Sequence, residues 1–591
     1  MDSLRQKLIG LINATKRKKP YRCEVEYVES TEKDSFFPLF TTDNIVDSTT
    51  SWEVRLSFND VSFTGQLMGY GYSGNNRYNL GIESGKFRFA YSTTWFDAAI
   101  TTPDTNPHTW KLEPVNGKDA NAYIDWQVTS TTASNDFGAN NWFIGIGGRS
   151  AANNQIQSGT QFGWKLYYSK VWKAGKLVVD VIPVIDWDDK PCLYDKISGK
   201  LIYATIRNTL DSSGTLAIIT AGREIHRVDW ISSPNRNVCF NTNIYPQMDN
   251  FKIEVRAIKE ANTSLFGSNT TNNYYDLTGS SGNNYAHYGT SAGSFASFAL
   301  TDQNMPHTFM MENGNVYCDG VLKGSKTSES FTSSVPMGLF ARITNASGTF
   351  NDSGNHTMYY TKIWNNGSLV RDYYPAIDET GKAFLFDKVS HQIFDNTGTG
   401  VVNYPPVEVE YLQSSGTQYI DTPATFKDTD TVEFKGALLT LTSDKFCMSP
   451  TTWNAGNNRF SMLGYYSPSL GVAFGSQGTP STIFVPNLVN TDVHTVRFED
   501  RKFTMLDTGS VYDPTSAVTF ANETDGIKMF YGYNAPTSCK FYYYKHWRDG
   551  VIKYNFVAAL CNGEAGLYDK VNNVFYPNNG TGDFTYGKIK N

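Results

Sequence analysis

Four short phrases recur three times along this chain of 591 residues, always in the same order. They are a Val-acid-aromatic opening, a His-Thr pair, an aromatic run that ends in Trp, and an Asp-Lys-Val/Ile phrase. The aspartate of the last phrase follows the tryptophan by 23, 23 and 22 residues. Ordered phrases at matched spacing indicate three copies of one domain. The markers are Val25, Val228 and Val409; His108, His307 and His494; Trp172, Trp364 and Trp547; and Asp195, Asp387 and Asp569.

The repeat sets the domain boundaries that we expect. A chain of this length is too long for one hydrophobic core, and a copy of about 180 to 200 residues is large enough to bury its own. Pro405-Pro406 marks the second junction, and Ala221-Gly222 marks the first. The predicted divisions are an N-terminal segment, 1–20, and three domains, 21–222, 223–406 and 407–591.

Each copy has the pattern of many short strands. Aromatic residues make up 14% of the chain, and apolar residues alternate with polar ones between clusters of Gly, Asn, Ser and Thr. Many strands with almost no helix predict an all-β fold, with a two-sheet sandwich or jelly roll in each copy. The one predicted helix covers residues 2–15, where Leu4, Leu8, Leu11 and Ile12 share one face.

Three segments of the third copy bear a resemblance to a known family: Val409–Thr422, Phe541–Leu560 and the closing GLYDKVNNVFYPNNGTG. They resemble LamG-like, concanavalin A-like jelly-roll domains, which occur in virion proteins of gut tailed (crAss-like) phages and in gut bacterial surface proteins. The second copy is similar in VRDYYPAIDETGKAFLFDKV, and the first departs most. The resemblance implies three tandem jelly rolls, but the fold hosts lectins, adhesins, glycanases and architectural domains, so it does not choose a function.

The N-terminal segment differs from the rest of the chain. Its predicted amphipathic helix is followed by a basic run, and a helix of this length needs a surface to pack on. We expect it to anchor the chain to a partner protein, although a helix lying on a membrane surface and a frayed tail remain alternatives. The basic run is Lys16, Arg17, Lys18 and Lys19.

Charge and cysteine content exclude several classes of protein. A formal net charge of −6 gives no general attraction to nucleic acid, and no run of about 18 apolar residues predicts a membrane span. The N-terminus lacks the pattern of a signal peptide. The seven cysteines form no C-x-x-C pair, which argues against a zinc site or a disulfide framework and favours folding in a reducing compartment.

Catalysis has one local candidate. Glycoside hydrolysis needs two carboxylates across the sugar, and Glu24, Glu26 and Glu29 are spaced like the acids of concanavalin A-like glycanases. Only the middle acid, Glu26, has an acidic equivalent in both other copies, so we expect no catalytic residues there. The repeated aspartates are expected to hold strand-to-turn corners. The repeated histidines are expected to begin strands, with the imidazole bonded to backbone and no carboxylate partner that recurs.

Binding is the better functional interpretation of the loops. Aromatic faces stack on sugar rings, and the candidate ligand-binding residues are Trp95, Tyr285, Trp453 and Tyr466. No metal site and no cofactor is predicted, because no ligand set repeats and no nucleotide fingerprint is present.

These features and the resemblance favour a phage virion structural protein, as a head fibre, a decoration or a tail appendage. It would be assembled in the host cytoplasm, would contact other virion proteins through its N-terminus, and would bind a host-surface glycan or a virion protein. By analogy with such appendages we expect a homo-oligomer, for example a trimer. A glycan-degrading depolymerase and a bacterial surface adhesin are the alternatives.

Overall fold

The computed structural model describes most of the chain. The described residues are 19–30, 35–39, 46–62, 64–70, 77–100, 102–138, 144–151, 155–159, 163–206, 219–247, 250–270, 273–280, 282–290, 294–300, 302–326, 332–442, 445–450, 459–466, 469–475, 481–484, 491–513, 525–532 and 535–590. Within these ranges the chain forms strands and turns and no helix, which confirms the all-β class. The predicted helix over residues 2–15 lies outside them. Across the described part, no helix is long and apolar enough to cross a membrane.

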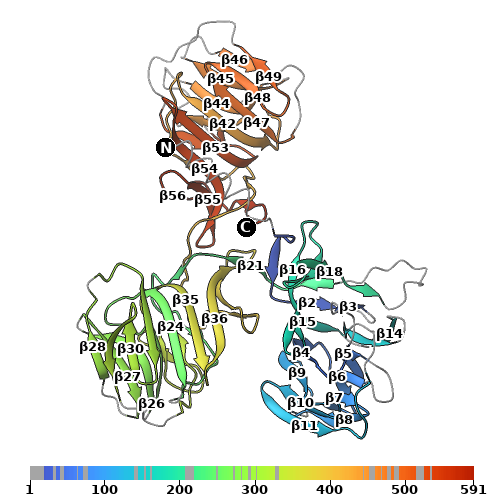
Figure 1. Ribbon diagram of the computed structural model, residues 1–591. Helices are drawn as coiled ribbons and strands as arrows, with labels where there is room; N and C mark the ends of the chain where they lie inside the picture. The colour runs from blue at the N-terminus through green and yellow to red at the C-terminus, as the bar shows by residue number, and fades with distance from the viewer. Residues whose placement is uncertain are drawn as a thin grey trace, which may run out of the picture.

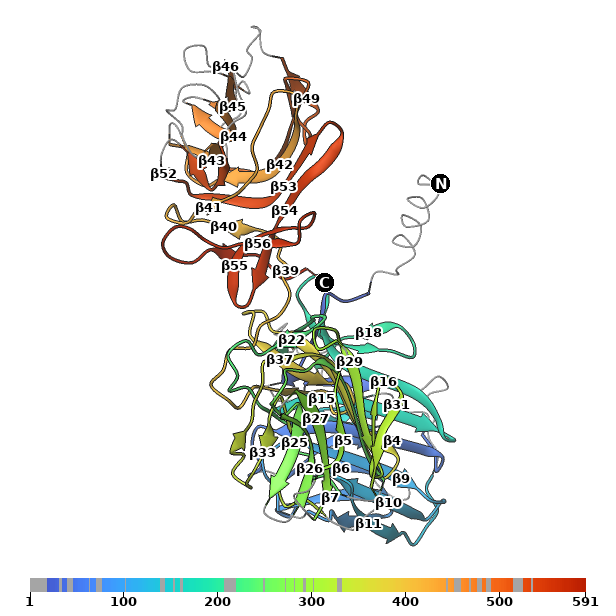
Figure 2. The same cartoon turned by 90° about the vertical axis from the view of Figure 1, so that its left-hand side faces the viewer.

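The strands gather in three lobes, which Figure 1 shows meeting near β21. We call them the N-terminal lobe (β1–β20, residues 23–221), the middle lobe (β21–β38, residues 224–394) and the C-terminal lobe (β39–β57, residues 407–586). Figure 2, turned by 90°, shows the C-terminal lobe standing apart from the other two, which overlap in that view.

The first sheet of every lobe has the same strand order. In the N-terminal lobe the order is β11 (Gln127–Thr132), β10 (Asp119–Ile124), β9 (His108–Pro114), β4 (Thr50–Phe58), β15 (Trp164–Lys173), β16 (Lys176–Ile185), β17 (Pro191–Asp195), β18 (Lys200–Ile202). In the middle lobe it is β31 (Val321–Ser325), β30 (Asn315–Cys318), β29 (His307–Glu312), β24 (Phe251–Ile258), β35 (Thr357–Asn365), β36 (Ser368–Ile377), β37 (Ala383–Asp387), β38 (Gln392–Phe394). In the C-terminal lobe it is β49 (Ser510–Tyr512), β48 (Lys502–Met505), β47 (His494–Glu499), β42 (Thr431–Leu438), β53 (Cys539–Arg548), β54 (Val551–Cys561), β55 (Glu564–Asp569), β56 (Val574–Tyr576).

A second sheet faces the first in each lobe. Its order in the N-terminal lobe is β19 (Thr205–Ile206), β3 (Ser35–Leu39), β12 (Ile144–Ile146), β5 (Gly65–Tyr70), β6 (Arg77–Glu83), β7 (Lys86–Ser92), β8 (Thr94–Asp97). In the middle lobe it is β23 (Phe240–Asn241), β32 (Gly338–Leu339), β25 (Phe266–Thr270), β26 (Asn273–Ser280), β27 (Asn283–Gly289), β28 (Ser294–Phe298). In the C-terminal lobe it is β41 (Ile420–Asp421), β50 (Ile527–Met529), β43 (Lys445–Pro450), β44 (Arg459–Tyr466), β45 (Ser469–Gly475), β46 (Ser481–Phe484).

The two sheets of a lobe bury the alternate apolar residues that the sequence supplies. Along β24, FKIEVRAI, every second residue is buried, as expected of a strand with one face on a core. In the N-terminal lobe Trp52 of β4 packs edge-on against Tyr78 of β6, with ring centroids 6.1 Å apart. Each lobe is therefore a sandwich of two sheets in which antiparallel pairing predominates, with aromatic residues between them.

The repeated tryptophans mark a second shared feature of the first sheet. In each lobe the pairing of the Trp-bearing strand with the next strand shifts register immediately before the tryptophan, at Trp172, Trp364 and Trp547. Such a β-bulge increases the local twist of the strand. The aromatic run that ends in Trp therefore marks the position of this bulge in the first sheet of each lobe.

Candidate binding site at the junction of the lobes

The repeated aspartates hold corners of the fold, as predicted. Asp387 is fully buried, and its Oδ1 accepts the backbone N–H groups of Asp372 at 2.8 Å and Val389 at 3.1 Å. Asp195 and Asp569 accept the N–H groups of the equivalent residues: Asp180 and Ile197, and Asn555 and Val571. The carboxylate thus ties the turn to the preceding strand, and its oxygens are engaged with backbone donors.

The repeated histidines begin β9, β29 and β47, as predicted, but their expected lack of a recurring carboxylate partner is wrong. His108 Nδ1 lies 2.5 Å from Asp125 Oδ2, and the same contact is 2.6 Å between His307 and Asp319. His494 Nδ1 lies 2.7 Å from Asp507 Oδ2. Each aspartate belongs to a hairpin turn of the first sheet, so the pair connects the start of one strand to a neighbouring turn. We call each of these three histidine–aspartate pairs a His-Asp clasp.

The aromatic residues predicted to bind a ligand are not brought together. Trp95 lies half-buried on β8 of the N-terminal lobe, with the Arg88 guanidinium 5.9 Å from its ring, and Tyr285 lies half-buried on β27 of the middle lobe. Tyr466 ends β44 in the C-terminal lobe, and Trp453 lies outside the described residues. Of the predicted anchor, Leu4, Leu8, Leu11, Ile12, Lys16, Arg17 and Lys18 also lie outside them, and Lys19 is described.

The three acids weighed as a catalytic set have separate partners. Glu24 Oε1 accepts the Tyr21 hydroxyl at 3.0 Å, whereas Glu29 Oε1 accepts the Asn59 amide at 2.6 Å. Burial raises the pKa of the Glu26 carboxyl, against the opposing effect of Arg223. These hydrogen bonds engage Glu24 and Glu29 with different parts of the N-terminal lobe.

Strand pairing joins the N-terminal lobe to the middle lobe. The short strand β1 (Cys23–Val25) lies between β16 of its own lobe and β21 (Glu224–Arg227) of the middle lobe. Strand β21 pairs in turn with β36. Backbone hydrogen bonds therefore run from one lobe into the next.

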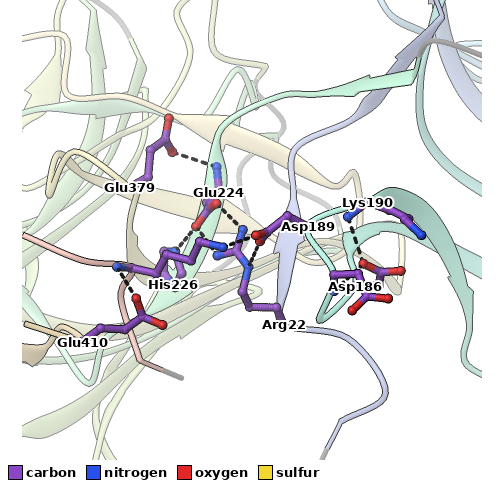
Figure 3. Close-up of polar contacts among 10 residues, drawn as sticks. Arg22, Asp186, Asp189, Lys190, Glu224, His226, Glu379 and Glu410 are labelled. Carbon is purple, nitrogen blue, oxygen red and sulfur yellow. Dashed lines mark hydrogen bonds and ion pairs between the residues drawn. The ribbon is translucent and has the colours of Figure 1, made fainter. Parts of the chain in front are cut away.

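Arg22 links charged groups on both sides of this junction (Figure 3). Its guanidinium donates to both carboxylate oxygens of Glu224, at 2.6 and 3.0 Å, and its Nε lies 3.1 Å from Asp189. His226 contributes a second contact to Glu224, at 2.7 Å. Burial opposes the charged form of Glu224, but the hydrogen bonds from His226 and Arg22 outweigh it and lower the pKa of this carboxyl to about 2.

The C-terminal lobe reaches the same network. The Lys588 ammonium group pairs with Asp189, and the Lys588 backbone N–H donates to Glu410 at 3.3 Å. Glu379 of the middle lobe accepts the Glu224 N–H at 2.9 Å. Figure 3 shows Asp189, Glu224, Glu379 and Glu410 gathered around Arg22, so charged residues of all three lobes meet at one place.

A cavity of about 820 Å³ opens beside this network, between the N-terminal and middle lobes. This volume falls within the range of small-molecule sites in proteins. Its wall combines aromatic rings with cationic groups. The rings are Tyr21, Trp187, Tyr374, Phe386 and His391. The cations are Lys19, Arg22, Lys196, Arg227 and Lys388.

Arg227 differs from the other cations of the cavity. Lys19 lies 3.5 Å from Glu24, Lys196 lies 3.9 Å from Asp180 and Lys388 lies 3.6 Å from Asp372. Arg227 is exposed, lies 5.4 Å from the centroid of the Tyr374 ring, and forms no ion pair with any residue that the structure describes. Its guanidinium is therefore the group best placed to receive a carboxylate, in the two-pronged geometry that arginine favours.

Sequence reasoning missed this cavity and the clasp aspartates. Trp187 and Arg227 are about forty residues apart, no motif connects them, and only the packing of two lobes brings both to one cavity. Asp125, Asp319 and Asp507 carried a detectable signal, because each follows its histidine by 12 to 17 residues at a hairpin turn.

Comparison with known proteins identifies no family for this chain. No family model matches the chain, and no curated protein does. The chain is similar in structure to laminin alpha2 chain region LG1-3, with 8% identity, coverage of 95% of this chain and 100% of that chain, and a TM-score of 0.27. It is similar to mouse laminin alpha1 chain domains LG4-5, with 12% identity, coverage of 59% and 92%, and a TM-score of 0.21. A leech intramolecular trans-sialidase gives 11% identity, coverage of 96% and 98%, and a TM-score of 0.17. Because these scores are low, they add nothing to the strand order given above.

Proposed function

We propose that this chain is a binding protein without enzymatic activity, built of three tandem concanavalin A-like domains, and that it holds a carboxylated glycan between its first two domains. The proposed domains are 21–222, 223–406 and 407–591, after the N-terminal segment 1–20. The observation on which this rests is the cavity between the N-terminal and middle lobes, which is lined by exposed Arg227 and by Trp187, which is 49% exposed.

The chemistry of the cavity suits a sugar acid. The exposed Trp187 ring offers a flat apolar face to the C–H groups of a pyranose. Arg227 supplies parallel N–H donors for a carboxylate, and the paired lysines supply donors for hydroxyl groups. A neutral glycan would leave the Arg227 donors unsatisfied in the complex, so we expect it to bind more weakly.

The absence of catalysis is supported by the repeated acids. Asp195, Asp387 and Asp569 accept backbone N–H groups inside their lobes, which leaves no free carboxylate pair among them. Glu24 and Glu29 are bound to different neighbours. Two-carboxylate glycoside hydrolysis needs two acids that face one substrate.

The proposed setting is the virion of a tailed phage, as a head fibre, decoration or tail appendage assembled in the host cytoplasm. It rests on the resemblance of Val409–Thr422, Phe541–Leu560 and the closing phrase to domains of such virion proteins. Residues 1–20 would contact other virion proteins, and several copies would assemble as a homo-oligomer. Multiple copies would raise the avidity for a repetitive host-surface glycan.

The glycan proposal is tested by binding of the full chain to a panel of acidic and neutral glycans. We expect binding to carboxylated glycans, and a loss of at least about 100-fold for Arg227→Ala combined with Lys388→Ala, because two charged hydrogen bonds of about 1.5–3 kcal/mol each are removed. The matched control is Arg236→Ala with Lys502→Ala. It removes the same charge from exposed pairs with Glu260 and Asp513, neither of which lines the cavity.

Three outcomes would contradict this function. Equal binding of neutral and acidic glycans would show that Arg227 does not recognise a carboxylate of the ligand. An equal loss in the control variant would show a general charge effect. Cleavage of a polysaccharide that is lost in a combined Glu24→Gln, Glu26→Gln and Glu29→Gln variant would make the chain a depolymerase.

A further inference from the structure

Three potential metal ligands meet beside the cavity, where the N-terminal and middle lobes join. Cys23 Sγ, a carboxylate oxygen of Glu224 and a ring nitrogen of His226 all lie within 4.8 Å of one another. Cys23 is 2% exposed and His226 is 1% exposed. A thiolate, an imidazole and a carboxylate form a ligand set of the kind that binds zinc.

The strand register explains why these residues meet. Strands β1 and β21 are antiparallel, with Glu24 opposite Ile225 and Val25 opposite Glu224. One residue further along this register, Cys23 stands opposite His226, and Glu224 lies on the same face because it is two residues from His226. The backbone that joins the two lobes therefore places the ligands before any ion is present.

The surroundings can supply an ion with access and with charge balance. The Glu224 side chain is 17% exposed, so an ion and a water molecule can reach the ligand set along its carboxylate. A divalent cation would be neutralised by the Cys23 thiolate and the Glu224 carboxylate. Arg22, which now donates to Glu224, would keep its second acidic partner, Asp189, at 3.1 Å.

We propose that Cys23, Glu224 and His226 bind one divalent transition-metal ion of the zinc class, with a water molecule from solvent completing a tetrahedral site. The ion joins ligands from two lobes and fastens one lobe to the other. Sulfur and nitrogen ligands favour zinc over calcium or magnesium, which prefer oxygen. This site is independent of the proposed glycan function, because a protein that does not bind glycan could still bind the metal ion, and the reverse also holds.

Binding requires the Cys23 thiol to release its proton to solvent. Burial, together with the charge of Glu224, raises the pKa of this thiol to about 12, so the metal-free protein holds the proton at neutral pH. Metal binding should therefore release about one proton and weaken as the pH falls.

The other candidate group supplies an internal control. His307, Cys318 and Asp319 also bring ligand atoms within 4.8 Å, but all three belong to one hairpin region of the middle lobe. Asp319 already accepts the His307 ring and the Thr308 N–H, and the second ring nitrogen of His307 contacts the Asp302 carbonyl at 2.7 Å. We therefore place the ion at Cys23.

The test is titration of the full-length, metal-free protein with Co²⁺, followed by displacement with Zn²⁺. We expect one equivalent of Co²⁺ with a near-ultraviolet thiolate charge-transfer band that Zn²⁺ abolishes. Cys23→Ser should remove the band, and His226→Ala should weaken Co²⁺ binding by at least about tenfold, given the cost of losing one ligand. Cys318→Ser and Cys192→Ser, which alter buried thiols outside the group, should leave the band unchanged.

Several results would overturn the site. The site is excluded if the wild-type protein shows no charge-transfer band, if the band persists in Cys23→Ser, or if it is lost in Cys318→Ser. Weak binding of several equivalents that all variants share would indicate an adventitious ion only. X-ray absorption spectroscopy of zinc bound to the wild-type protein needs no variant. It therefore tests the site even if Cys23→Ser does not fold. A shell without one sulfur neighbour would also exclude Cys23 as a ligand.

Discussion

At the residue scale, the most informative side chain is the aspartate that each copy repeats. Asp387 accepts N–H groups from both Asp372 and Val389 and also binds the Ser390 hydroxyl at 2.5 Å. A carboxylate that serves several buried donors cannot be removed without leaving those donors unsatisfied. The repeat therefore conserves a hydrogen-bond acceptor at a corner of the sandwich.

We predict that Asp387→Ala lowers the free energy of unfolding by roughly 3 kcal/mol, because two or more buried donors lose their acceptor. Asp387→Asn keeps one acceptor oxygen and should cost less. The matched control is Asp372→Asn, which removes only a partly exposed pair with Lys388 at 3.6 Å and should cost under about 1 kcal/mol. Denaturant unfolding measures all three, and an Asp387→Ala loss no larger than that of the control would refute the structural role.

At the element scale, the His-Asp clasp connects the start of β9 to the hairpin between β10 and β11. Asp125 and Trp126 at that turn have positive φ angles of 47° and 70°, a backbone that suits the right-handed twist of paired strands. Asp125 also accepts the Thr109 N–H at 2.9 Å, so one carboxylate fixes both the histidine ring and the strand. The middle lobe repeats this arrangement at Asp319 and Gly320, whose φ angles are 50° and 76°.

The clasp predicts a pH dependence. Burial disfavours protonated His108, but its hydrogen bonds to Asp125 and Asp104 outweigh burial and raise the pKa of the imidazole. This contribution to stability is complete below the unfolded pKa of about 6.5 and is lost as the pH rises through the higher folded pKa. Asp125→Asn should lower the pKa of His108, as measured by NMR titration of the ring proton, and should leave His307 unchanged. Asp319→Asn should do the reverse, and an unmoved His108 pKa in Asp125→Asn would exclude the clasp.

The elements show what the sequence could and could not predict. The all-β class, the strands begun by the histidines and the corners held by the aspartates followed from local phrases, because period-two alternation and turn residues act over a few positions. Each histidine is followed by an aspartate at a hairpin turn, but the distance varies from 12 to 17 residues, and only the pairing of the strands shows that the turn reaches the histidine. Trp95 and Tyr285 are predicted to bind a ligand as single residues, and a single residue gives no sign of which others will face it.

At the scale of the whole molecule, the junction depends on contacts between residues far apart in the chain. Arg22 meets Glu224, and Asp189 meets Lys588, across separations of 202 and 399 residues. In the zinc-class site, Cys23 and His226 are likewise neighbours only through the register of β1 with β21. Local zinc motifs rely on closely spaced ligands, so a site divided between lobes leaves no such motif in the sequence.

The packing of the middle lobe on the N-terminal lobe should weaken in acid. His391 is 4% exposed and lies 5.4 Å, between ring centroids, from Tyr168 of the N-terminal lobe. Burial first, and then the charges of Lys196 and Lys170, lower the pKa of His391 well below its usual value. The contact is therefore complete above pH of about 6.5 and is progressively lost below it, as the unfolded or separated state binds the proton more readily.

We predict that small-angle scattering will show the radius of gyration rising between pH 6.5 and 4.5, while circular dichroism shows the strands intact. His391→Gln, which cannot take up the proton, should reduce this expansion. The matched control is His356→Gln, because His356 is also buried, with a pKa lowered to about 3 by burial and by Lys259, but its ring bonds to Ser264 within the middle lobe. That variant should alter the acid stability of the middle lobe and leave the expansion unchanged. If the expansion persists in His391→Gln, groups other than His391 cause the acid response. The neutral form of His391 would then not stabilise the interface of these two lobes.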